Sequence, residues 1–286
     1  MSRNLLHYLQ PLQLSNLIPK RDQYAHKGTF GSLAIIGGDA GMIGAVLLAA
    51  RAALHSGAGR VYAAMLSERA PSVDMQQPEI MLRSAEAITQ LAQLNAVVIG
   101  PGLGQSEQAL QLLFFWITQN VPLLLDADAL NLIASHPNLA TLIANRQAET
   151  VITPHAGEAA RLMATTSHEI QADRIGSALS LSQLFKATCV LKGNKTIIAH
   201  HQGDYFINTT GNVGLATGGT GDVLSGIVGS LIAQGLSAID AANLGVYVHG
   251  LAADNLVKSG VGPIGLMASE VLLEARKVLN EMRLET

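Results

Sequence analysis

Cysteine is nearly absent from this chain of 286 residues, which contains only Cys189. A single cysteine excludes an intrachain disulfide framework and fits a reducing compartment. Because Cys189 stands in a short apolar run, we interpret it as a buried structural thiol. The first residues lack an uninterrupted apolar stretch before a cleavage site. We therefore expect no secretion signal and a cytoplasmic protein.

Charged and aromatic residues are also scarce, at 14% and 4% of the sequence. The formal net charge is −3, and the longest basic cluster is Lys20-Arg21, which argues against nucleic acid as a main ligand. No apolar run is long enough to span a bilayer, so we expect no membrane association. Hydrophobic residues nevertheless reach 49%, mostly Ala, Leu, Ile and Val. This composition predicts a large core in which helices cover both faces of a sheet.

Short apolar segments alternate with helical patterns along the chain. We expect strands at residues 32–36, 61–64, 96–99, 122–125, 151–153 and 188–191, a hairpin of 197–199 with 204–207, and helices at 45–55, 107–119, 175–186, 223–233, 238–257 and 268–282. This order predicts an α/β fold with a mainly parallel sheet. Because no linker or repeat divides the chain, we expect one domain over residues 1–286, with residues 1–25 as an N-terminal helix or arm.

The most informative stretch is residues 208–226, which contains six glycines and four threonines and leads directly into an apolar helix. Its centre is Gly218-Gly219-Thr220-Gly221-Asp222. A glycine-rich turn at a helix start directs several backbone N–H groups and the positive end of the helix dipole at one point. Phosphate is the usual ligand of such a point. Gly219, Thr220 and Gly221 are therefore candidates for an anion hole.

Asp222 on the first helical turn would repel phosphate unless it had a second task. A carboxylate next to an anion hole can take the proton from a hydroxyl that attacks phosphorus, which indicates phosphoryl transfer to an alcohol. The alternatives are a plain glycine loop and an aspartate that only caps the helix. The full glycine-rich setting favours the phosphate site.

Two further glycine loops follow predicted strands, at residues 37–44 and 100–104. Loops at the carboxyl ends of parallel strands usually face a ligand. The first loop lacks the GxGxxG pattern of dinucleotide-binding folds, so we interpret it as a lid or a substrate wall.

Three other strand ends carry candidate polar residues. Asp126 has either a functional or a structural role, while Asp128 is expected to cap the helix that begins at residue 129. His155 lies at a loop apex from which it can reach a ligand. Glu158 falls at a helix start, where an acid complements the helix dipole. Lys192 either meets a nucleotide phosphate or is a solvated turn lysine, and the residues alone leave both readings open.

A series of motifs in a fixed order now permits a comparison with a known family: His26-Lys27-Gly28 with Phe30-Gly31, Pro101-Gly102-Leu103-Gly104, Leu125-Asp126-Ala127-Asp128-Ala129-Leu130, Thr153-Pro154-His155 with Gly157-Glu158, Lys192-Gly193, and Asn208 with Thr210-Gly211-Asn212 before Gly218-Gly219-Thr220-Gly221-Asp222. The series covers nearly the whole chain and resembles the ADP- or ATP-dependent NAD(P)H-hydrate dehydratases of the ribokinase-like superfamily. Ala156 and Val213 stand where the family often has proline, which loosens two loops without removing a catalytic group.

The resemblance implies a three-layer α/β/α ribokinase-like fold and a hydro-lyase that repairs nicotinamide nucleotides. The substrate would be the S-epimer of hydrated NADH or NADPH, and ADP or ATP with Mg²⁺ would phosphorylate its ring hydroxyl before phosphate is eliminated. The family's site residues correspond here to Asp222 with Gly219, Thr220 and Gly221 for catalysis; Ala45, Gly104, His155 and Asp222 for the hydrate; Lys192, Gly193, Asn194, Lys195, Thr196 and Gly221 for the nucleotide; and Glu158 for the metal, through water.

Two other functions are compatible with parts of the pattern. The first is an ATP-dependent kinase of a small alcohol such as a vitamin precursor, although His155 replaces the asparagine of the kinases' Asn-x-x-Glu motif. The second is a nucleotide-binding regulator without turnover, which the intact Asp222 disfavours. By resemblance we also expect a homo-oligomer, in particular a tetramer, and a separate epimerase in the same pathway. Nothing in the residues decides between ADP and ATP, or between the two hydrates.

Overall fold

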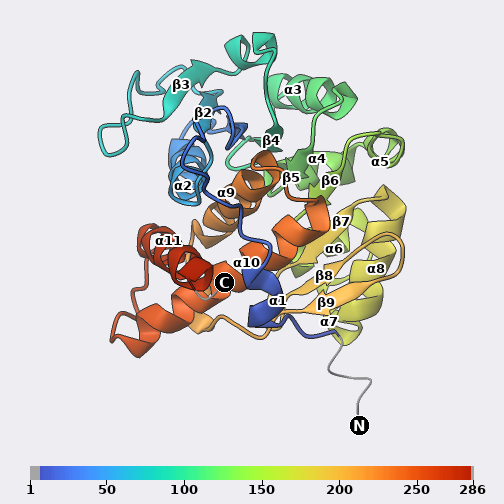
Figure 1. Cartoon of the computed structure of the whole chain (residues 1–286). Helices are drawn as coiled ribbons and strands as arrows, with labels where there is room; N and C mark the ends of the chain where they lie inside the picture. Colours follow the sequence, from blue (N-terminus) through green and yellow to red (C-terminus); the bar gives the residue numbers. More distant parts are fainter. Residues whose placement is uncertain (1–6, 285–286) are drawn as a thin grey trace.

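The computed structural model describes residues 7–284 and contains one nine-stranded sheet flanked by helices on both faces (Figure 1). The strand order is β3-β2-β1-β4-β5-β6-β7-β8-β9. Neighbours from β3 to β7 along this order pair in parallel, whereas β8 pairs antiparallel with both β7 and β9. The strands are β1 (Ser32–Gly37), β2 (Arg60–Met65), β3 (Met81–Ser84), β4 (Ala96–Ile99), β5 (Leu123–Leu125), β6 (Thr150–Ile152), β7 (Thr188–Leu191), β8 (Ile197–Ala199) and β9 (Tyr205–Ile207).

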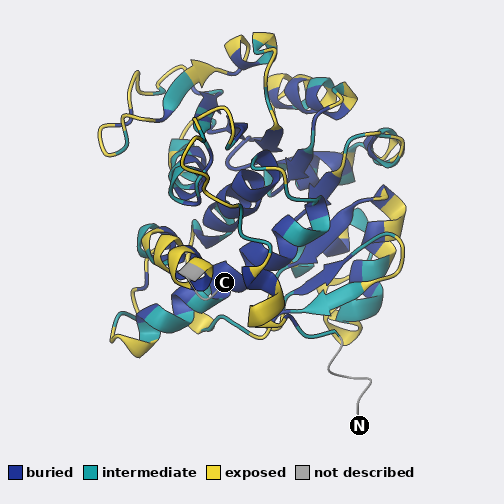
Figure 2. Cartoon of the chain, in the orientation of Figure 1, coloured by how far each residue is buried: buried dark blue, intermediate teal, exposed yellow. Residues whose placement is uncertain are grey.

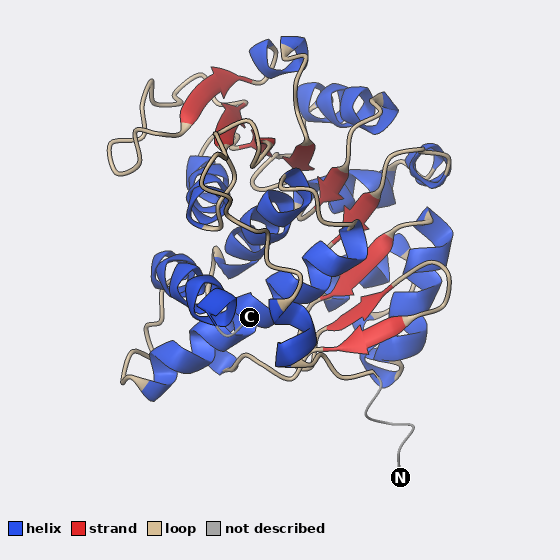
Figure 3. Cartoon of the chain, in the orientation of Figure 1, coloured by secondary structure: helices blue, strands red, loops and turns tan. Residues whose placement is uncertain are grey.

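The helices form the two outer layers, with the strands between them (Figure 3). They are α1 (Pro11–Ser15), α2 (Ile43–His55), α3 (Glu107–Thr118), α4 (Asp128–Ser135), α5 (Asn138–Ala144), α6 (Ala156–Leu162), α7 (Ser167–Ala172), α8 (Arg174–Phe185), α9 (Thr220–Ala233), α10 (Ala238–Lys258) and α11 (Ala268–Leu284), with short 3₁₀ turns η1 (Ala87–Gln90) and η2 (Val213–Leu215). None of the described helices is long and apolar enough to cross a bilayer.

Side chains that alternate along each strand divide the core into two clusters, as the pleat of a β-strand requires. In β1, Leu33 and Ile35 join the cluster that α2, α9, α10 and α11 cover. Ala34 and Ile36 face the second cluster, under α3, α4, α5 and α8. The central strands and the inward helix faces are buried in Figure 2, whereas the edge strands β3 and β9 are partly exposed. The three-layer α/β/α fold with a mainly parallel sheet, expected from the sequence, is confirmed.

The N-terminal arm is only briefly helical. Residues 1–6 lie outside the described part of the chain, and α1 contributes five residues. Tyr8 forms a parallel bridge with Ile207 on the outermost strand, and the His7 ring stacks on Tyr205 with 4.1 Å between centroids. Leu9 and Leu14 are buried. The arm is thus packed onto the edge of the sheet and onto the core beneath α11.

The expected elements are present, with some differences in bounds. Helix α9 begins at Thr220, three residues before the expected start, because the glycine-rich turn itself enters the helix. Strand β3 and helices α5 and α7 are short and were not expected from the sequence, although the Thr166–Glu169 capping box is a local signal for the start of α7. Cys189 is fully buried, as expected, and burial raises the pKa of its thiol.

Candidate active site

The candidate site residues gather at one edge of the sheet, where the parallel strands have their carboxyl ends. Asp126, His155 and Lys192 follow β5, β6 and β7, respectively. The N-terminal part of α9 reaches the same edge, because the Ser225 hydroxyl donates to Asp126 Oδ2 at 2.7 Å. Ligands of open α/β folds bind at this edge.

The N-terminus of α9 is left without a side-chain cap. Its N-cap residue, Gly219, has φ +91°, a left-handed conformation that glycine adopts without strain. The Thr220 hydroxyl donates to the carbonyls of Leu215 and Thr217 at 2.7 and 2.9 Å, so it holds the preceding loop and is not free for a ligand. The backbone N–H groups of the first turn have no partner within the helix. This uncapped helix start is compatible with the anion hole that the sequence predicts, although the Thr220 N–H also donates to the Thr217 carbonyl at 3.5 Å.

Close packing against α2 fixes the position of this helix start. A Cβ on Gly219 would lie 2.6 Å from Leu48 Cδ1, and one on Gly226 would lie 2.1 Å from the Ala49 carbonyl oxygen. Ala45 stands three residues before Leu48, on the same face of α2. This expected hydrate contact therefore lies on the side of α2 that faces the anion hole.

Asp222 is half-buried on the first turn of α9. Burial, together with the charges of Asp126 and Asp128, raises the pKa of its carboxyl to about 7, although Lys192 opposes the change. A carboxyl whose pKa is close to neutral both accepts and releases a proton readily at working pH. This property suits a general base.

Lys192 lies in a cluster of acids, largely withdrawn from solvent. Its Nζ is 2.7 Å from Asp126 Oδ1 and 3.9 Å from Glu158 Oε2, and its side chain is 19% exposed. Burial would lower the pKa of Lys192, but Asp126 and Glu158 outweigh that effect and raise it. A Cβ placed on Gly221 would lie 3.5 Å from Lys192 Nζ, so the ammonium stands beside the anion hole. The solvated-turn reading of Lys192 is therefore wrong.

Asp126 holds this lysine in place. Burial alone would raise its pKa, but the charge and hydrogen bond of Lys192, with hydrogen bonds from Ser225 and Thr153, lower it. Asp126 is 1% exposed. A carboxylate buried this deeply and used by two other elements has a structural role in aiming Lys192.

His155 and Glu158 close the N-terminus of α6 between them. His155 Nδ1 accepts from the N–H groups of Gly157 and Glu158 at 3.0 and 3.3 Å, and Glu158 Oε2 accepts from the His155 N–H at 2.8 Å. His155 Nε2 lies 3.3 Å from Glu158 Oε1. Burial lowers the pKa of His155, Glu158 raises it, and Lys192 lowers it, with a net decrease. The exposed side of this ring still borders the cavity described next.

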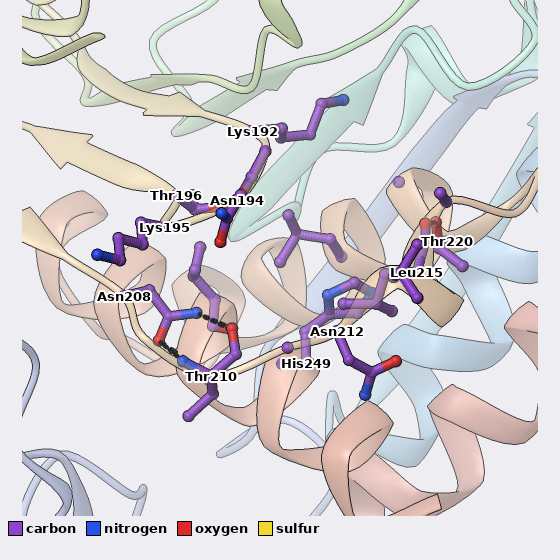
Figure 4. A pocket seen from close by; sticks show the side chains of 18 of the residues that line it. Lys192, Asn194, Lys195, Thr196, Asn208, Thr210, Asn212, Leu215, Thr220 and His249 are labelled. Atoms are coloured by element: carbon purple, nitrogen blue, oxygen red, sulfur yellow. Dashed lines mark hydrogen bonds between the residues drawn. The ribbon is translucent and has the colours of Figure 1, made fainter. Parts of the chain in front are cut away.

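A cavity of about 760 Å³ opens beside the anion hole (Figure 4). Its wall includes His155 and every residue that the resemblance implied for the nucleotide: Lys192, Gly193, Asn194, Lys195, Thr196 and Gly221. In Figure 4 the segment of Lys192 to Thr196 faces Leu215 and Thr220 across the cavity. The structure thus brings these six residues together.

Ala45, Gly104 and Asp222 do not belong to that wall. Gly104 lies on the loop after β4, which is joined to the loop after β1 by the bonds Gly38 N–H to Pro101 O at 3.0 Å and Asp39 N–H to Gly102 O at 2.7 Å. These two loops form a separate wall at the same sheet edge, consistent with the substrate-wall interpretation.

The expected capping role of Asp128 is wrong. Helix α4 begins at Asp128 itself, and its Oδ2 accepts from the Gly104 N–H at 2.9 Å. The carboxylate therefore ties the loop after β4 to the start of α4, a contact that local sequence spacing does not reveal.

No protein site for a metal ion is formed by the described residues, since no group of three or more His, Cys, Asp or Glu residues could hold one. Both carboxylate oxygens of Glu158 already have partners in His155.

Several cavity residues were not assigned from the sequence. The Asn208 and Thr210 side chains attach their loop to the α10 carbonyls of Val246 and Tyr247, at 3.5 and 3.0 Å, and Asp254 Oδ2 accepts from the Gly211 N–H at 2.8 Å. His249 on α10 is buried in the cavity wall. The polar residues 208, 210 and 212 were the signal that could have indicated this wall.

The strand order, with helices on both faces of the sheet and an uncapped helix start at its edge, defines a protein of the ribokinase-like class. Residues 33–273 match the family described as NAD(P)H-hydrate dehydratase, and the chain belongs to that family. It is 42% identical over 274 residues to the ADP-dependent (S)-NAD(P)H-hydrate dehydratase of Neisseria meningitidis, covering 95% of this chain and 92% of the relative.

Two further comparisons agree. The bifunctional NAD(P)H-hydrate repair enzyme of Coxiella burnetii is 42% identical, but the match covers 92% of this chain and 53% of that longer protein. The solved structure of the ADP/ATP-dependent NAD(P)H-hydrate dehydratase of Bacillus subtilis, co-crystallised with ATP and Mg²⁺, has a TM-score of 0.87 at 30% identity. The match covers 96% of this chain and 98% of the Bacillus subtilis chain.

Proposed function

We propose that this protein dehydrates the S-epimer of hydrated NADH or NADPH with ADP or ATP as the phosphoryl donor, and so restores the reduced nicotinamide nucleotide. The observation that carries the proposal is Asp222. Its carboxyl, with a pKa of about 7, lies on the first turn of an uncapped helix and beside a cavity lined by Lys192 and Gly221. The names of the relatives supply the substrate class.

The first step transfers a phosphoryl group to the ring hydroxyl of the hydrate. The Asp222 carboxylate takes the hydroxyl proton as the oxygen attacks the terminal phosphorus of the nucleotide. The bond from that phosphorus to the bridging oxygen breaks, and AMP leaves if ADP is the donor. The N–H groups of Gly219, Thr220 and Gly221 bind the charge that develops, and the loss of one such donor generally costs about 3–4 kcal/mol.

The second step removes phosphate, which is a much better leaving group than hydroxide. The lone pair of the ring nitrogen forms a double bond to the carbon that carries the phosphate, and the carbon–oxygen bond breaks. The neighbouring ring carbon then loses a proton to the released phosphate or to water, which restores the dihydronicotinamide. The ammonium of Lys192, aimed by Asp126, neutralises part of the phosphate charge.

Other residues hold the two substrates and the metal ion. Ala45, Gly104 and His155 contact the hydrate, and Lys192 to Thr196 contact the nucleotide. Mg²⁺ accompanies the nucleotide phosphates and lowers their negative charge, with Glu158 reaching it through water. We further propose a cytoplasmic homo-oligomer, a tetramer by resemblance, that works with a separate epimerase.

The test is incubation of the purified protein with hydrated NADPH and Mg²⁺, together with ADP or ATP, while the absorbance of the reduced nicotinamide is followed. We expect that absorbance to recover and inorganic phosphate to be released. Both should be faster with one of the nucleotides than without any nucleotide. A stable phosphorylated product without recovery would instead identify a kinase. No consumption of either nucleotide would contradict both activities.

A further inference from the structure

One buried polar atom in the cavity wall has no partner. Among the described residues, the buried side-chain atoms without a hydrogen bond are Trp116 Nε1, Arg174 Nε, Asn243 Oδ1 and His249 Nε2. Of these, His249 belongs to a residue that lines the 760 Å³ cavity. Its side chain is 7% exposed. An unpaired buried acceptor or donor generally costs about 1–3 kcal/mol, which a ligand that supplies the missing bond would recover.

The protonation of His249 determines what it can bind. Burial lowers the pKa of its imidazole to about 4, so the ring is neutral near pH 7 and carries one N–H. A hydrogen bond with the backbone of Thr220 acts in the opposite direction and raises the pKa. A bond with this effect is one that the imidazole donates. The N–H is thus used by Thr220, and Nε2 remains as an acceptor.

The Nε2 acceptor of His249 can bind only those parts of a nucleotide that donate a hydrogen bond. The charged end of the cavity lies at Gly221 and Lys192, where phosphate fits. His249 also lies close to this end, since its ring bonds to the Thr220 backbone and the charge of Lys192 lowers its pKa. The apolar side chains of Leu215, Leu224 and Val246 line the same cavity. Figure 4 shows its ring on α10, near Leu215 and below the start of α9. Phosphate oxygens are acceptors at neutral pH and cannot donate to Nε2.

We infer that His249 accepts a hydrogen bond from the nucleoside part of the bound nucleotide, either from a ribose hydroxyl or from the amino group of the base. Because His249 also bonds to Thr220, it connects recognition of the nucleoside to the position of the anion hole. His249 is thus a specificity-determining residue. This inference rests on the proposed function, which requires an adenine nucleotide in this cavity.

The test is calorimetric titration of the full chain with ADP, 2′-deoxy-ADP, 3′-deoxy-ADP and IDP, in which an oxo group replaces the amino group. The wild type is compared with His249→Asn, which keeps a donor near Nδ1 but loses the Nε2 position, and with His249→Gln, which keeps an acceptor near Nε2. We expect His249→Asn to weaken ADP binding about 3- to 10-fold, the range of one neutral hydrogen bond. His249→Gln should recover part of that loss.

The analogues identify the donor. One of them should bind the wild type about 3- to 10-fold less tightly than ADP binds the wild type. On His249→Asn, the same analogue and ADP should have equal affinities. A loss with IDP assigns the base amino group, and a loss with a deoxy analogue assigns a ribose hydroxyl. If all the analogues bind the wild type as tightly as ADP, the inference is overturned even if the variants do not fold.

Two further results would overturn it in distinguishable ways. Wild-type affinity for ADP in His249→Asn would remove His249 from recognition and leave the proposed function intact. Failure of the wild type to bind either ADP or ATP would overturn the inference together with the proposed function.

Discussion

Two helix N-termini at the same sheet edge, those of α6 and α9, are built in opposite ways. At α6 the His155 ring and the Glu158 carboxylate form a reciprocal capping box that satisfies the N–H groups of the first turn and of the N-cap. At α9 the N-cap is Gly219, without a side chain that could do the same. The first helix start is closed by its own residues, whereas the second is open to a ligand.

The difference shows that a helix N-terminus can contribute either to stability or to ligand binding. A side-chain cap on a helix start commonly stabilises a protein by about 1 kcal/mol, and α9 forgoes that contribution. Close packing on α2 through Gly226 and Leu48 holds α9 in place instead. The N–H groups of the first turn and Asp222 are thus held at the cavity side of the sheet edge. Changes at α9 should therefore affect turnover, and changes at α6 mainly stability.

The largest effect should come from Asp222→Asn, which removes the base at the open helix start. We expect kcat to fall about 10²- to 10⁴-fold, the usual contribution of general acid–base catalysis, with ADP affinity little changed. Steady-state kinetics and calorimetry measure these two quantities. The control is Asp240→Asn, since Asp240 also lies on a first helical turn, where its carboxylate accepts from the Ser237 hydroxyl. Equal turnover in Asp222→Asn and the wild type would exclude Asp222 from the reaction.

A second prediction concerns the pH profile. The carboxylate form of Asp222 is the active one, so kcat/KM of the wild type should rise with pH through about 7 and fall tenfold per unit below it. Lys192 lowers the pKa of Asp222, and Lys192→Met should therefore move this limb to higher pH and also weaken nucleotide binding. If the pH dependence of kcat/KM is the same in Lys192→Met and the wild type, Lys192 does not influence the pKa of the general base.

The matched control for this variant is Lys277→Met. Lys277 Nζ pairs with Glu274 Oε2 at 2.7 Å, the same separation as in the Lys192–Asp126 pair, but its side chain is 62% exposed. An exposed pair contributes little and lies outside the cavity. Lys277→Met should keep the wild-type pH profile and nucleotide affinity.

The smallest effect should follow the loss of the closed helix start. His155→Ala removes the α6 cap and should lower the free energy of unfolding by about 1 kcal/mol, as measured by denaturant titration. Thr166→Ala removes the equivalent cap of α7 and should cost a similar amount. Only His155→Ala should also raise KM for the hydrate. An undiminished stability in His155→Ala would show that the capping box contributes nothing.

The order of strands and helices could be predicted because it is written in local patterns. The apolar segments around Ile35 and Val98 became central strands, and the stretch from Gly218 to Asp222 became a helix start at the ligand edge. The role of Asp128 was misjudged for the opposite reason. Its partner, Gly104, is 24 residues away and meets it only because β4 and β5 are neighbours.

By itself, the sequence determined the α/β architecture, the glycine-rich turn at the start of α9 and the position of Asp222 on it. Backbone conformation and hydrophobic periodicity are local properties. Tertiary structure alone decided that Lys192 is held by Asp126, 66 residues away, and that Asp126 also receives Ser225, 99 residues away. It also decided that His249 turns a buried, unpaired nitrogen to the cavity wall. Burial and charge partners come from packing across distant segments, and no local pattern encodes them.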